Sequence, residues 1–411
     1  MKLKNSLIAA LLVGGVMVVA PSCNRKGCTD PTANNYDEKA KKEDPDEPCT
    51  YDLPTGYTVV TIGGVSYNQL DANLTQDMTL DAASNWLLSG GTFVNDGVTL
   101  TIEAGTTVYT ADDGTVPFLS VSQGGKLMAV GTASSPIVFT PISVTPAPGD
   151  WGGIILNGYA PINTGATAEG EGGTGTYGGA IADDNSGTLQ YVRVEYAGKL
   201  LSTDNELNGF SFNGVGSGTS LSYLQAYRGN DDGFEFFGGT VSLSNAVSSG
   251  NGDDSFDWTH GWVGTGTNWI VEQDATLGDR GIEADNNGDN NDAMPMSAPS
   301  ISKLTITGRG SSAEKDAIKL REGTSATIDN VLITGAKDGI DIQHDVTAAN
   351  VTAGTLTITN VTASSDVTNP YAVNVAAGTD STNTANMLNT AVNGAGTGAD
   401  TGWTSGWTKA L

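Results

Sequence analysis

Three acidic residues, Glu235, Asp257 and Glu283, occupy the same place in three copies of one short sequence pattern. Each has an apolar residue on both sides, so in a β-strand its side chain points away from the core. If successive copies form neighbouring strands, the three carboxylates lie about 5 Å apart. Like charges at this distance repel unless a cation or a shared proton neutralises them. The column therefore indicates either a Ca²⁺ site, because Ca²⁺ prefers oxygen ligands, or a carboxylate pair for glycoside hydrolysis.

A second acidic column lies three residues before the first apolar position of each copy. It contains Asp231, Asp253 and Asp279, which are candidate ligand-binding residues. In later copies both columns change character, with Lys315 and Lys337 in the second column and Lys319 and Asp341 in the first. A solvated strand face would explain the same acids without any ligand. Three further acids precede a small residue at a turn, where Asp commonly bonds its own backbone, namely Asp232, Asp254 and Asp338.

The same region offers groups for catalysis. The candidate catalytic residues are the three carboxylates of the first column together with His260 and Arg280. Retaining glycosidases hold two carboxyl groups about 5–5.5 Å apart and inverting ones about 6.5–9.5 Å apart, and stacked strands supply both distances. A lyase would need a Lys or Arg base, and no motif selects one among Arg228, Arg280, Lys319 and Arg321.

The residues that must position these side chains form five copies of one pattern, a turn residue followed by an apolar–polar–apolar alternation. The copies span residues 232–236, 254–258, 280–284, 316–320 and 338–342. Their spacings are 22, 26, 36 and 22 residues, and the longest interval indicates one coil with an insertion. A strand-based period of this size predicts a solenoid of stacked coils. The alternation places two apolar columns in its core, Phe234, Phe256, Ile282, Ile318 and Ile340, and Phe236, Trp258, Ala284, Leu320 and Ile342.

Composition agrees with an all-β solenoid. The chain has 411 residues with 55 glycines and only 16% charged residues, and no stretch shows a sustained helical period. We expect about ten to twelve coils, which would make a rod roughly 50–60 Å long. The 19 basic and 46 acidic residues give a net charge of −27. Such a surface repels phosphate backbones, so nucleic acid is not an expected partner, whereas cations are. The acidity could equally serve only to keep an exported protein soluble.

The first 22 residues are typical of a secretion signal. Lys2 and Lys4 precede an apolar run, 7–20, that is too short for a convincing membrane span. Cys23 follows directly, and this arrangement resembles a bacterial lipoprotein signal, in which the Cys becomes the lipidated N-terminus. The small residues at 20–22 would also suit an ordinary cleavage site.

Cysteine arithmetic favours lipidation. Of the three cysteines in this exported chain, Cys28 and Cys49 can pair, which leaves Cys23 for the lipid. The sequence from Gly27 to Tyr36, followed by an acidic run and Cys49-Thr-Tyr51, resembles a short disulfide-closed repeat of exported bacterial surface proteins. We expect a signal peptide at 1–22, an anchor, disulfide module and linker at 23–56, an N-terminal cap at 57–86, and a β-helix with a C-terminal cap at 87–411.

Longer segments of the body resemble a family of exported bacterial lipoproteins. The resemblance rests on residues 99–106, 189–196, 208–219, 230–240, 252–258 and 402–408 and covers roughly residues 85 to 408. It implies a right-handed parallel β-helix of the pectin-lyase type and carries no established activity. Asp253-Asp254 with His260-Gly261 also resembles the acidic pair and Gly-His-Gly of β-helical polygalacturonases, although Thr259 replaces the first Gly and Lys319-Leu-Arg321 reverses the expected Arg-Ile-Lys order.

Aromatic residues and two polar segments complete the set of predictions. Trp262 could stack on a sugar ring, whereas Trp258 is expected in the core, and Trp403 and Trp407 are expected to cap the open end of the solenoid. The Gly-rich segment 163–187 and the Asn-rich segment 285–292 are expected to be surface loops. The second is rich in oxygen ligands, but its Gly288 does not fit a helix–loop–helix calcium site.

These observations favour a cell-envelope or cell-surface lipoprotein that binds a polysaccharide or another surface component, with Ca²⁺ as a structural partner. A polysaccharide lyase or glycoside hydrolase acting through the outward acidic column is the first alternative. A structural adhesin or spacer is the second. Contact with the membrane is expected only through the N-terminal lipid.

Overall fold

The computed structural model describes residues 25–31, 33–50, 56–203 and 205–411, so the predicted signal peptide and Cys23 lie outside the described residues. The chain divides into two units, Met1–Thr55 and Gly56–Leu411. In the first unit Cys28 and Cys49 form a disulfide with their Cα atoms 4.8 Å apart, which confirms the predicted pairing. Among the described residues, no helix has both the length and the apolar character needed to cross a lipid bilayer.

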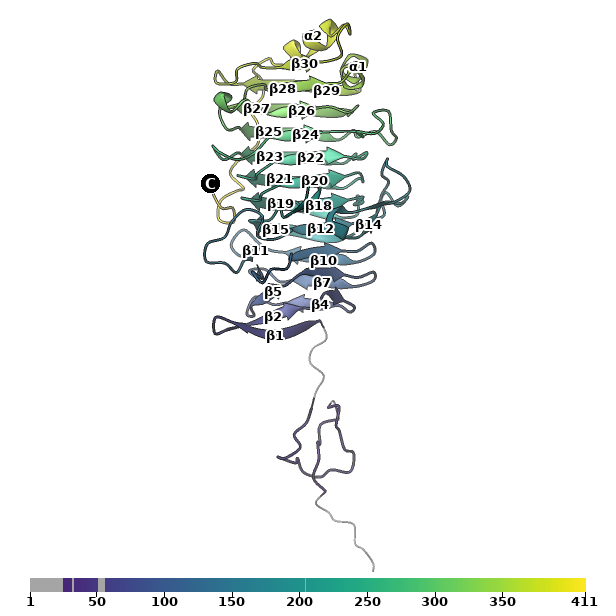
Figure 1. Ribbon diagram of the computed structural model, residues 1–411, viewed down its shortest axis with the longest axis vertical. Coiled ribbons are helices and arrows are strands. Elements are labelled where there is room, and N and C mark those ends of the chain that lie inside the picture. Colours follow the sequence, from purple (N-terminus) through teal and green to yellow (C-terminus); the bar gives the residue numbers. More distant parts are fainter. Residues whose placement is uncertain (1–24, 32, 51–55, 204) are drawn as a thin grey trace, which may run out of the picture. The chain divides into compact units, whose positions relative to one another are not determined.

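The second unit is built around two large sheets whose strands stack along one axis (Figure 1). The 11-stranded sheet contains, in spatial order, β3 (Asn73–Leu74), β6 (Gly91–Val94), β9 (Phe118–Val121), β12 (Ile154–Asn157), β18 (Phe210–Asn213), β20 (Phe234–Phe237), β22 (Phe256–Thr259), β24 (Ile282–Ala284), β26 (Ile318–Leu320), β28 (Ile340–Gln343) and β30 (Ala372–Asn374). All its neighbouring strands are parallel.

The 15-stranded sheet alternates with the first sheet along the chain. Its strands are β1 (Tyr57–Ile62), β2 (Val65–Leu70), β5 (Trp86–Leu88), β8 (Thr107–Thr110), β11 (Ile137–Pro141), β15 (Gly187–Glu195), β19 (Ser220–Tyr227), β21 (Ser242–Ser249), β23 (Thr265–Glu272), β25 (Ser300–Thr307), β27 (Ala326–Thr334) and β29 (Leu356–Ala363), together with β4 (Met78–Leu80), β7 (Thr99–Ile102) and β10 (Lys126–Val130). Except for the antiparallel pair β1–β2, these strands are also parallel. The unit is a parallel β-helix with eleven strands on one side, within the expected ten to twelve coils.

Smaller elements decorate the coils. Two short antiparallel pairs, β13 (Ala168–Glu169) with β14 (Thr176–Tyr177) and β16 (Leu200–Ser202) with β17 (Asn205–Glu206), project from the middle coils. The helices are α1 (Asp345–Ala353) and α2 (Thr382–Ala391), and the 3₁₀ turns are η1 (Glu171–Gly173) and η2 (Ser311–Ala313). Parallel pairing begins with β2, where Asn68 and Gln69 lie opposite Trp86 and Leu87 of β5, earlier in the chain than the expected start at residue 87.

The 15-stranded sheet is folded along a corner. β10 pairs with residues 187–190 of β15 and β11 pairs with residues 192–194, so the two halves of β15 belong to different faces. Between them lies Tyr191, whose φ of 51° is left-handed. Later coils repeat this bend at Tyr223, Asn245, Asn268, Lys303, Asn330 and Asn360. Asn tolerates the left-handed region better than other non-glycine residues. Because the 15-stranded sheet bends at this corner, each coil has three short faces.

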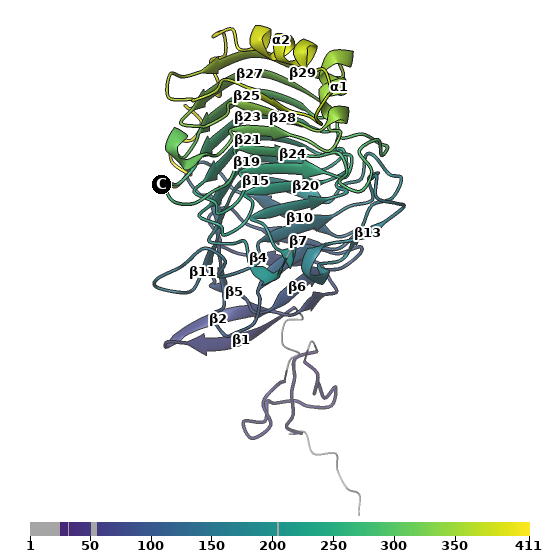
Figure 2. The same cartoon turned by 45° about the horizontal axis from the view of Figure 1, so that its top comes forward.

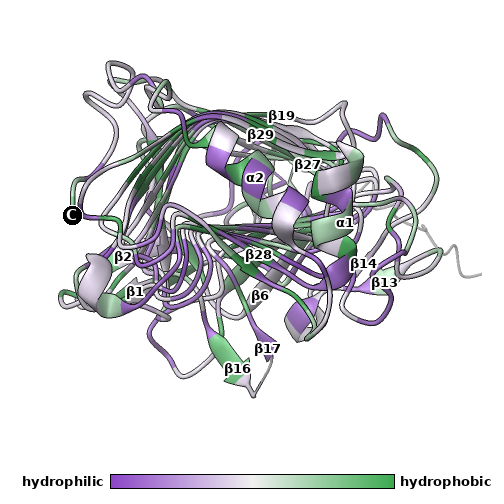
Figure 3. Cartoon of the chain, turned by 90° about the horizontal axis from the view of Figure 1, so that it is seen from above, coloured by the Kyte–Doolittle hydropathy of each residue, from purple (hydrophilic) through white to green (hydrophobic). Residues whose placement is uncertain are grey.

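The core consists of side chains stacked in register. Phe234, Phe256 and Ile282 lie opposite one another on successive strands and are fully buried, as are Ile318 and Ile340. The rings of Phe234 and Phe256 are stacked with their centroids 5.0 Å apart. This confirms the predicted inward column. Seen along the stack, the coils superimpose on one outline (Figure 3).

The C-terminal segment, residues 394–411, returns along the outside of the corner. The amide of Gly398 donates to the Asn330 side chain, the amide of Asp400 to Asn268, and the amide of Lys409 to Gln225. The C-terminus consequently lies beside the middle coils in Figure 1.

This course contradicts the expectation for Trp403 and Trp407. Both tryptophans pack on Tyr223 in a middle coil, and Trp407 also lies edge-on to Tyr191. The end of the stack is covered instead by α1 and α2, which pack against β29 (Figure 2). Helices satisfy their own backbone groups, so they close an open sheet edge more effectively than two indole rings.

Candidate functional site

The outward column runs along the 11-stranded sheet. The strand register places Glu235, Asp257 and Glu283 opposite one another on β20, β22 and β24, followed by Lys319 and Asp341 on β26 and β28. Neighbouring side chains cover part of this face: Glu283 is 8% exposed, Lys319 9% and Asp341 2%. A solvated strand face therefore does not describe these three residues. Charges held this far from water need partners.

The buried turn acids bind the next coil and not their own backbone. Asp232 accepts a hydrogen bond from the amide of Asp254 at 2.8 Å, and Asp254 accepts one from the amide of Arg280 at 2.5 Å. Asp338 accepts a hydrogen bond from the side chain of Asn369 at 2.6 Å. The expected local turns are thus replaced by links between coils, because each turn lies directly against the equivalent turn of the next coil.

The first half of the column is rich in carboxylates. Asp232, Glu235 and Asp257 each present an oxygen within 4.8 Å of the other two. Burial, reinforced by the neighbouring negative charges, raises the pKa of all three well above the usual value. Asp257 Oδ1 is buried and has no hydrogen-bond partner among the described residues. This half of the face holds more negative charge than its own side chains compensate.

Two loops bring further acids to the same place. Burial and the charge of Glu206 raise the pKa of Glu171 to about 7. Burial and the charges of Asp253, Glu206 and Glu171 raise the pKa of Asp231 to about 8. Glu171 lies in η1 and Glu206 in β17, and the amide of Gly172 in η1 donates to the Asn205 side chain. Sequence reasoning missed both glutamates, because neither belongs to the repeated pattern.

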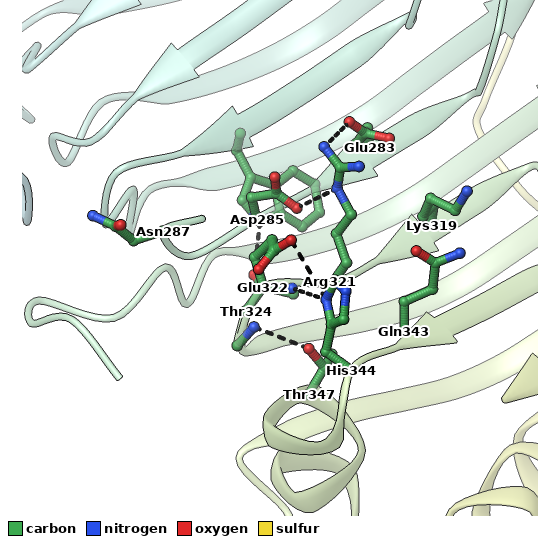
Figure 4. A network of polar contacts seen from close by, with 12 residues as sticks. Glu283, Asp285, Asn287, Lys319, Arg321, Glu322, Thr324, Gln343, His344 and Thr347 are labelled. Atoms are coloured by element: carbon green, nitrogen blue, oxygen red, sulfur yellow. Dashed lines mark hydrogen bonds and ion pairs between the residues drawn. The ribbon is translucent and has the colours of Figure 1, made fainter. Parts of the chain in front are cut away.

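The second half of the column is neutralised by basic residues. Glu283 forms an ion pair with Arg280 at 2.8 Å. It also pairs with Arg321, whose Nε bonds Asp285 at 2.9 Å (Figure 4). Arg280 contacts Asp279 as well, at 2.5 Å. For Asp279 burial acts to raise the pKa, but the hydrogen bond from Lys315 and the charge of Arg280 outweigh it and lower the pKa.

A polar pocket of about 290 Å³ opens beside this basic half. Its lining includes Lys315, Lys319 and Lys337 together with Asp316 and Asp341. Lys319 lies 3.3 Å from Asp316 and 3.9 Å from Asp341. The acidic half and the pocket therefore follow one another along the same face over successive coils.

The acidic half fits a hard divalent cation. Two oxygens that bind the same Ca²⁺ at about 2.3–2.6 Å are at most roughly 5 Å apart, and Asp232, Glu235 and Asp257 meet this limit. The buried Oδ1 of Asp257 supplies a ligand atom that no group in the described part of the chain satisfies. Glu283, the third residue expected in a metal site, also lies near Asp257 and Asp254, but its carboxylate is already paired with two arginines.

Two further candidates, His260 and Trp262, do not belong to the outward column. The ring of His260 meets the Tyr177 hydroxyl at 3.3 Å, and burial lowers the pKa of this histidine to about 4, so it is neutral at pH 7. Trp262 is fully buried and stacks on Phe236 with the ring centroids 4.1 Å apart. The prediction that Trp262 binds a sugar ring is therefore wrong, since this residue, in the connection between β22 and β23, is packed into the core. Trp258 lies in the core as expected.

The two segments expected to be surface loops are partly buried. In segment 285–292, Asn286 is fully buried and its side chain donates to the carbonyls of Asn291 and Ala293. Asn163, at the start of segment 163–187, donates to the Asn286 side chain at 2.9 Å. The Asn-rich insertion thus serves as a structural polar network, in which amide groups bond one another and the backbone.

The sequence matches the family described as pectate-lyase like β-helix domain over residues 72–408. The chain belongs to this family. No curated protein matches the sequence. Family membership agrees with the parallel β-helix and supports a polysaccharide-related role, without specifying a ligand or a reaction.

Proposed function

We propose that this protein binds a polysaccharide along the outer face of the 11-stranded sheet, with a divalent cation, best matched by Ca²⁺, in the acidic half. The observation that carries the proposal is the continuous line of charged side chains from Glu235 to Asp341, ending beside the polar pocket. Successive coils repeat about every 4.8 Å. An extended polymer can therefore contact several coils at once, whereas a small ligand would contact one or two.

The two halves of the face would contribute differently. The cation would be held by Asp232, Glu235 and Asp257, whose repulsion it would relieve, and its remaining coordination positions could accept sugar oxygens. The pocket lysines, Lys315 and Lys337, would donate hydrogen bonds to hydroxyl or acidic groups of the polymer. Binding of the cation must displace the protons that the raised pKa values retain.

Direct binding measurements test this proposal. The purified protein is titrated with CaCl₂ by calorimetry, and neutral, uronic-acid and sulfated polysaccharides are then tested with Ca²⁺ and with EDTA. We expect Ca²⁺ to bind with proton release and to strengthen retention of at least one polymer.

Asp257→Asn should weaken both effects, and Lys337→Ala should weaken polymer binding alone. Glu103 is an exposed acid that directly follows β7 of the 15-stranded sheet. Glu103→Gln should therefore change neither Ca²⁺ binding nor polymer retention. Absence of binding to every polymer class would refute the proposed function.

Glycoside hydrolysis is the alternative with a specific observation in its favour. Asp253, Asp254 and Asp279 have oxygens within 4.8 Å of one another. Burial and the charge of Asp279 raise the pKa of Asp253, whereas that of Asp279 itself is lowered. Two neighbouring carboxyl groups with opposite shifts are suited to acid and base roles. Hydrolysis of a polysaccharide releases reducing ends. If the wild type released them and Asp253→Asn did not, glycoside hydrolysis would be favoured over binding alone.

We also propose that the protein is exported and anchored to the cell envelope through a lipid on Cys23. The support is the signal-like sequence before Cys23 and the disulfide between the other two cysteines. An envelope location suits a protein that binds a surface polysaccharide, because the ligand is present there.

A further inference from the structure

The two ends of the β-helix are protected very differently. At one end α1 and α2 cover β29. At the other end the 15-stranded sheet stops at β1, which pairs with β2 alone among the described strands. The 11-stranded sheet begins with β3, which has only two residues and offers little edge. Figure 2 shows β1 and β2 as the first strands of the stack. Within the second unit, the edge of β1 is therefore the long unpaired strand edge at this end.

This edge lacks the usual protection against strand pairing. Soluble proteins normally protect edge strands with charged residues, proline, bulges or a covering helix. Residues 57–70 contain no Asp, Glu, Lys, Arg or Pro, although the chain has a net charge of −27. The register of β1 with β2 is continuous from Tyr57↔Leu70 to Ile62↔Val65, without a bulge. Three apolar side chains are exposed here, Val59 at 57%, Ile62 at 40% and Val65 at 45%.

We propose that β1 is a docking strand for a second copy of this chain. In the dimer, β1 pairs antiparallel with its counterpart about a two-fold axis, so that the 15-stranded sheet continues from one copy into the other. Such an interface uses the same surface on both partners and closes after two copies, which prevents fibre growth. The outward backbone groups of six residues can form about six hydrogen bonds.

The composition of β1 suits pairing with a second copy of itself. Its sequence, Tyr57-Thr-Val-Val-Thr-Ile62, consists wholly of aromatic and β-branched residues, which are the strongest strand formers. Any antiparallel register of two copies sets such residues opposite one another and opposes no like charges. The acidic bodies extend away from the shared edge, and their repulsion is screened beyond about 8 Å at physiological salt.

Sedimentation equilibrium on the Cys23→Ser protein tests the proposal without interference from a lipid. We expect a reversible dimer that becomes stronger as NaCl is raised, because salt screens the repulsion between the bodies. Thr58→Lys/Thr61→Lys changes two exposed edge residues and should weaken dimerisation by about tenfold or more. Thr265→Lys/Thr327→Lys adds the same charge at exposed positions of interior strands and should leave the dimer unchanged.

Hydrogen exchange locates the contact independently of these variants. Amides of 57–62 should exchange more slowly at high protein concentration, while those of the remaining strands should not change. A wild type that stays monomeric up to its solubility limit would overturn the proposal. So would a dimer that the edge lysines leave intact, since it would use another surface. The outcome is separate from polysaccharide binding, because neither Thr58 nor Thr61 belongs to the outward column.

Discussion

Asp232 accepts a hydrogen bond from the backbone amide of Asp254, the equivalent residue one coil later, at 2.8 Å. Both carboxylates are buried, and burial together with the neighbouring acids raises the pKa of each well above its usual value. An ionisable group has therefore been placed where burial disfavours its charged form, and it links two turns of the solenoid. The same residue also belongs to the acidic half of the candidate binding face.

Replacing Asp232 distinguishes its role as acceptor from its role as charge. Asp232→Ala leaves the buried amide of Asp254 without an acceptor and should lower the free energy of unfolding by about 1–3 kcal/mol. Asp232→Asn retains an acceptor oxygen and removes a charge, so it should be less destabilising than the alanine variant. Urea unfolding measures both. An asparagine variant as unstable as the alanine variant would show that the negative charge itself is required.

The core stack should be sensitive to truncation at Phe256. This ring is fully buried and lies between Phe234 and Ile282 of the neighbouring coils. Phe256→Ala should lower the free energy of unfolding by about 3–5 kcal/mol, because the coils cannot collapse around the cavity. Phe256→Leu fills most of the cavity and should lower the free energy of unfolding much less. If both variants lowered the free energy of unfolding equally, the volume of the side chain would not explain the contribution of Phe256.

The pH dependence of stability should reveal the acidic half. For Asp231 the folded-state pKa is about 8 and for Glu171 about 7, both above the ordinary values of 3.8 and 4.5. The folded protein then binds more protons than the unfolded chain between about pH 4 and 8, so stability should fall as pH rises through this range. Saturating Ca²⁺ should reduce the fall, because the cation replaces the protons.

Melting temperatures at several pH values measure this effect. Asp231→Asn and Glu171→Gln should each make the decline shallower, since each removes one titrating group. The exposed Glu103→Gln serves as the control and should leave the slope unchanged. A melting temperature that rises steadily from pH 5 to pH 8 in the wild type would contradict the predicted proton uptake.

The C-terminal segment should contribute strongly to stability. Trp407 is almost completely buried, its carbonyl accepts a hydrogen bond from Arg193, and its ring packs on Tyr191 and Tyr223. Trp407→Ala should lower the free energy of unfolding by about 3–5 kcal/mol, comparable to a core truncation. Thermal unfolding of this variant, compared with a variant of the exposed Met387, provides the measurement. No loss of stability would mean that the segment is only loosely attached.

Membrane fractionation tests the proposed anchor. Cys23→Ser should move the protein from the membrane fraction to the soluble fraction, because it removes the residue that would carry the lipid. Cys28→Ser should break only the disulfide with Cys49 and leave the fractionation unchanged. A wild-type protein that is already soluble, with a free amine at Cys23, would rule out lipidation.

The repeated pattern was sufficient to predict the fold. Phe256 and Asp257 show why, because alternation along one strand decides which side chain faces the core, and the repeat decides what lies opposite it. Glu171 shows the limit of this reasoning. It reaches Glu235 and Asp231 from a Gly-rich loop whose path depends on contacts with other coils, and no period in the sequence encodes such contacts. The burial of Asn286 was missed for the same reason.

The returning C-terminal segment changes how this solenoid can fold and unfold. A simple stack of coils is held by nearest neighbours, so it can open from either end one coil at a time. Residues 394–411 bond to Asn330, Asn268 and Gln225, which lie on β27, β23 and β19 and so belong to alternate coils of the stack. They are also synthesised after every coil that they contact. The middle coils therefore acquire their full set of contacts only once the whole body has been made, so residues 394–411 complete the packing of coils that precede them in the chain.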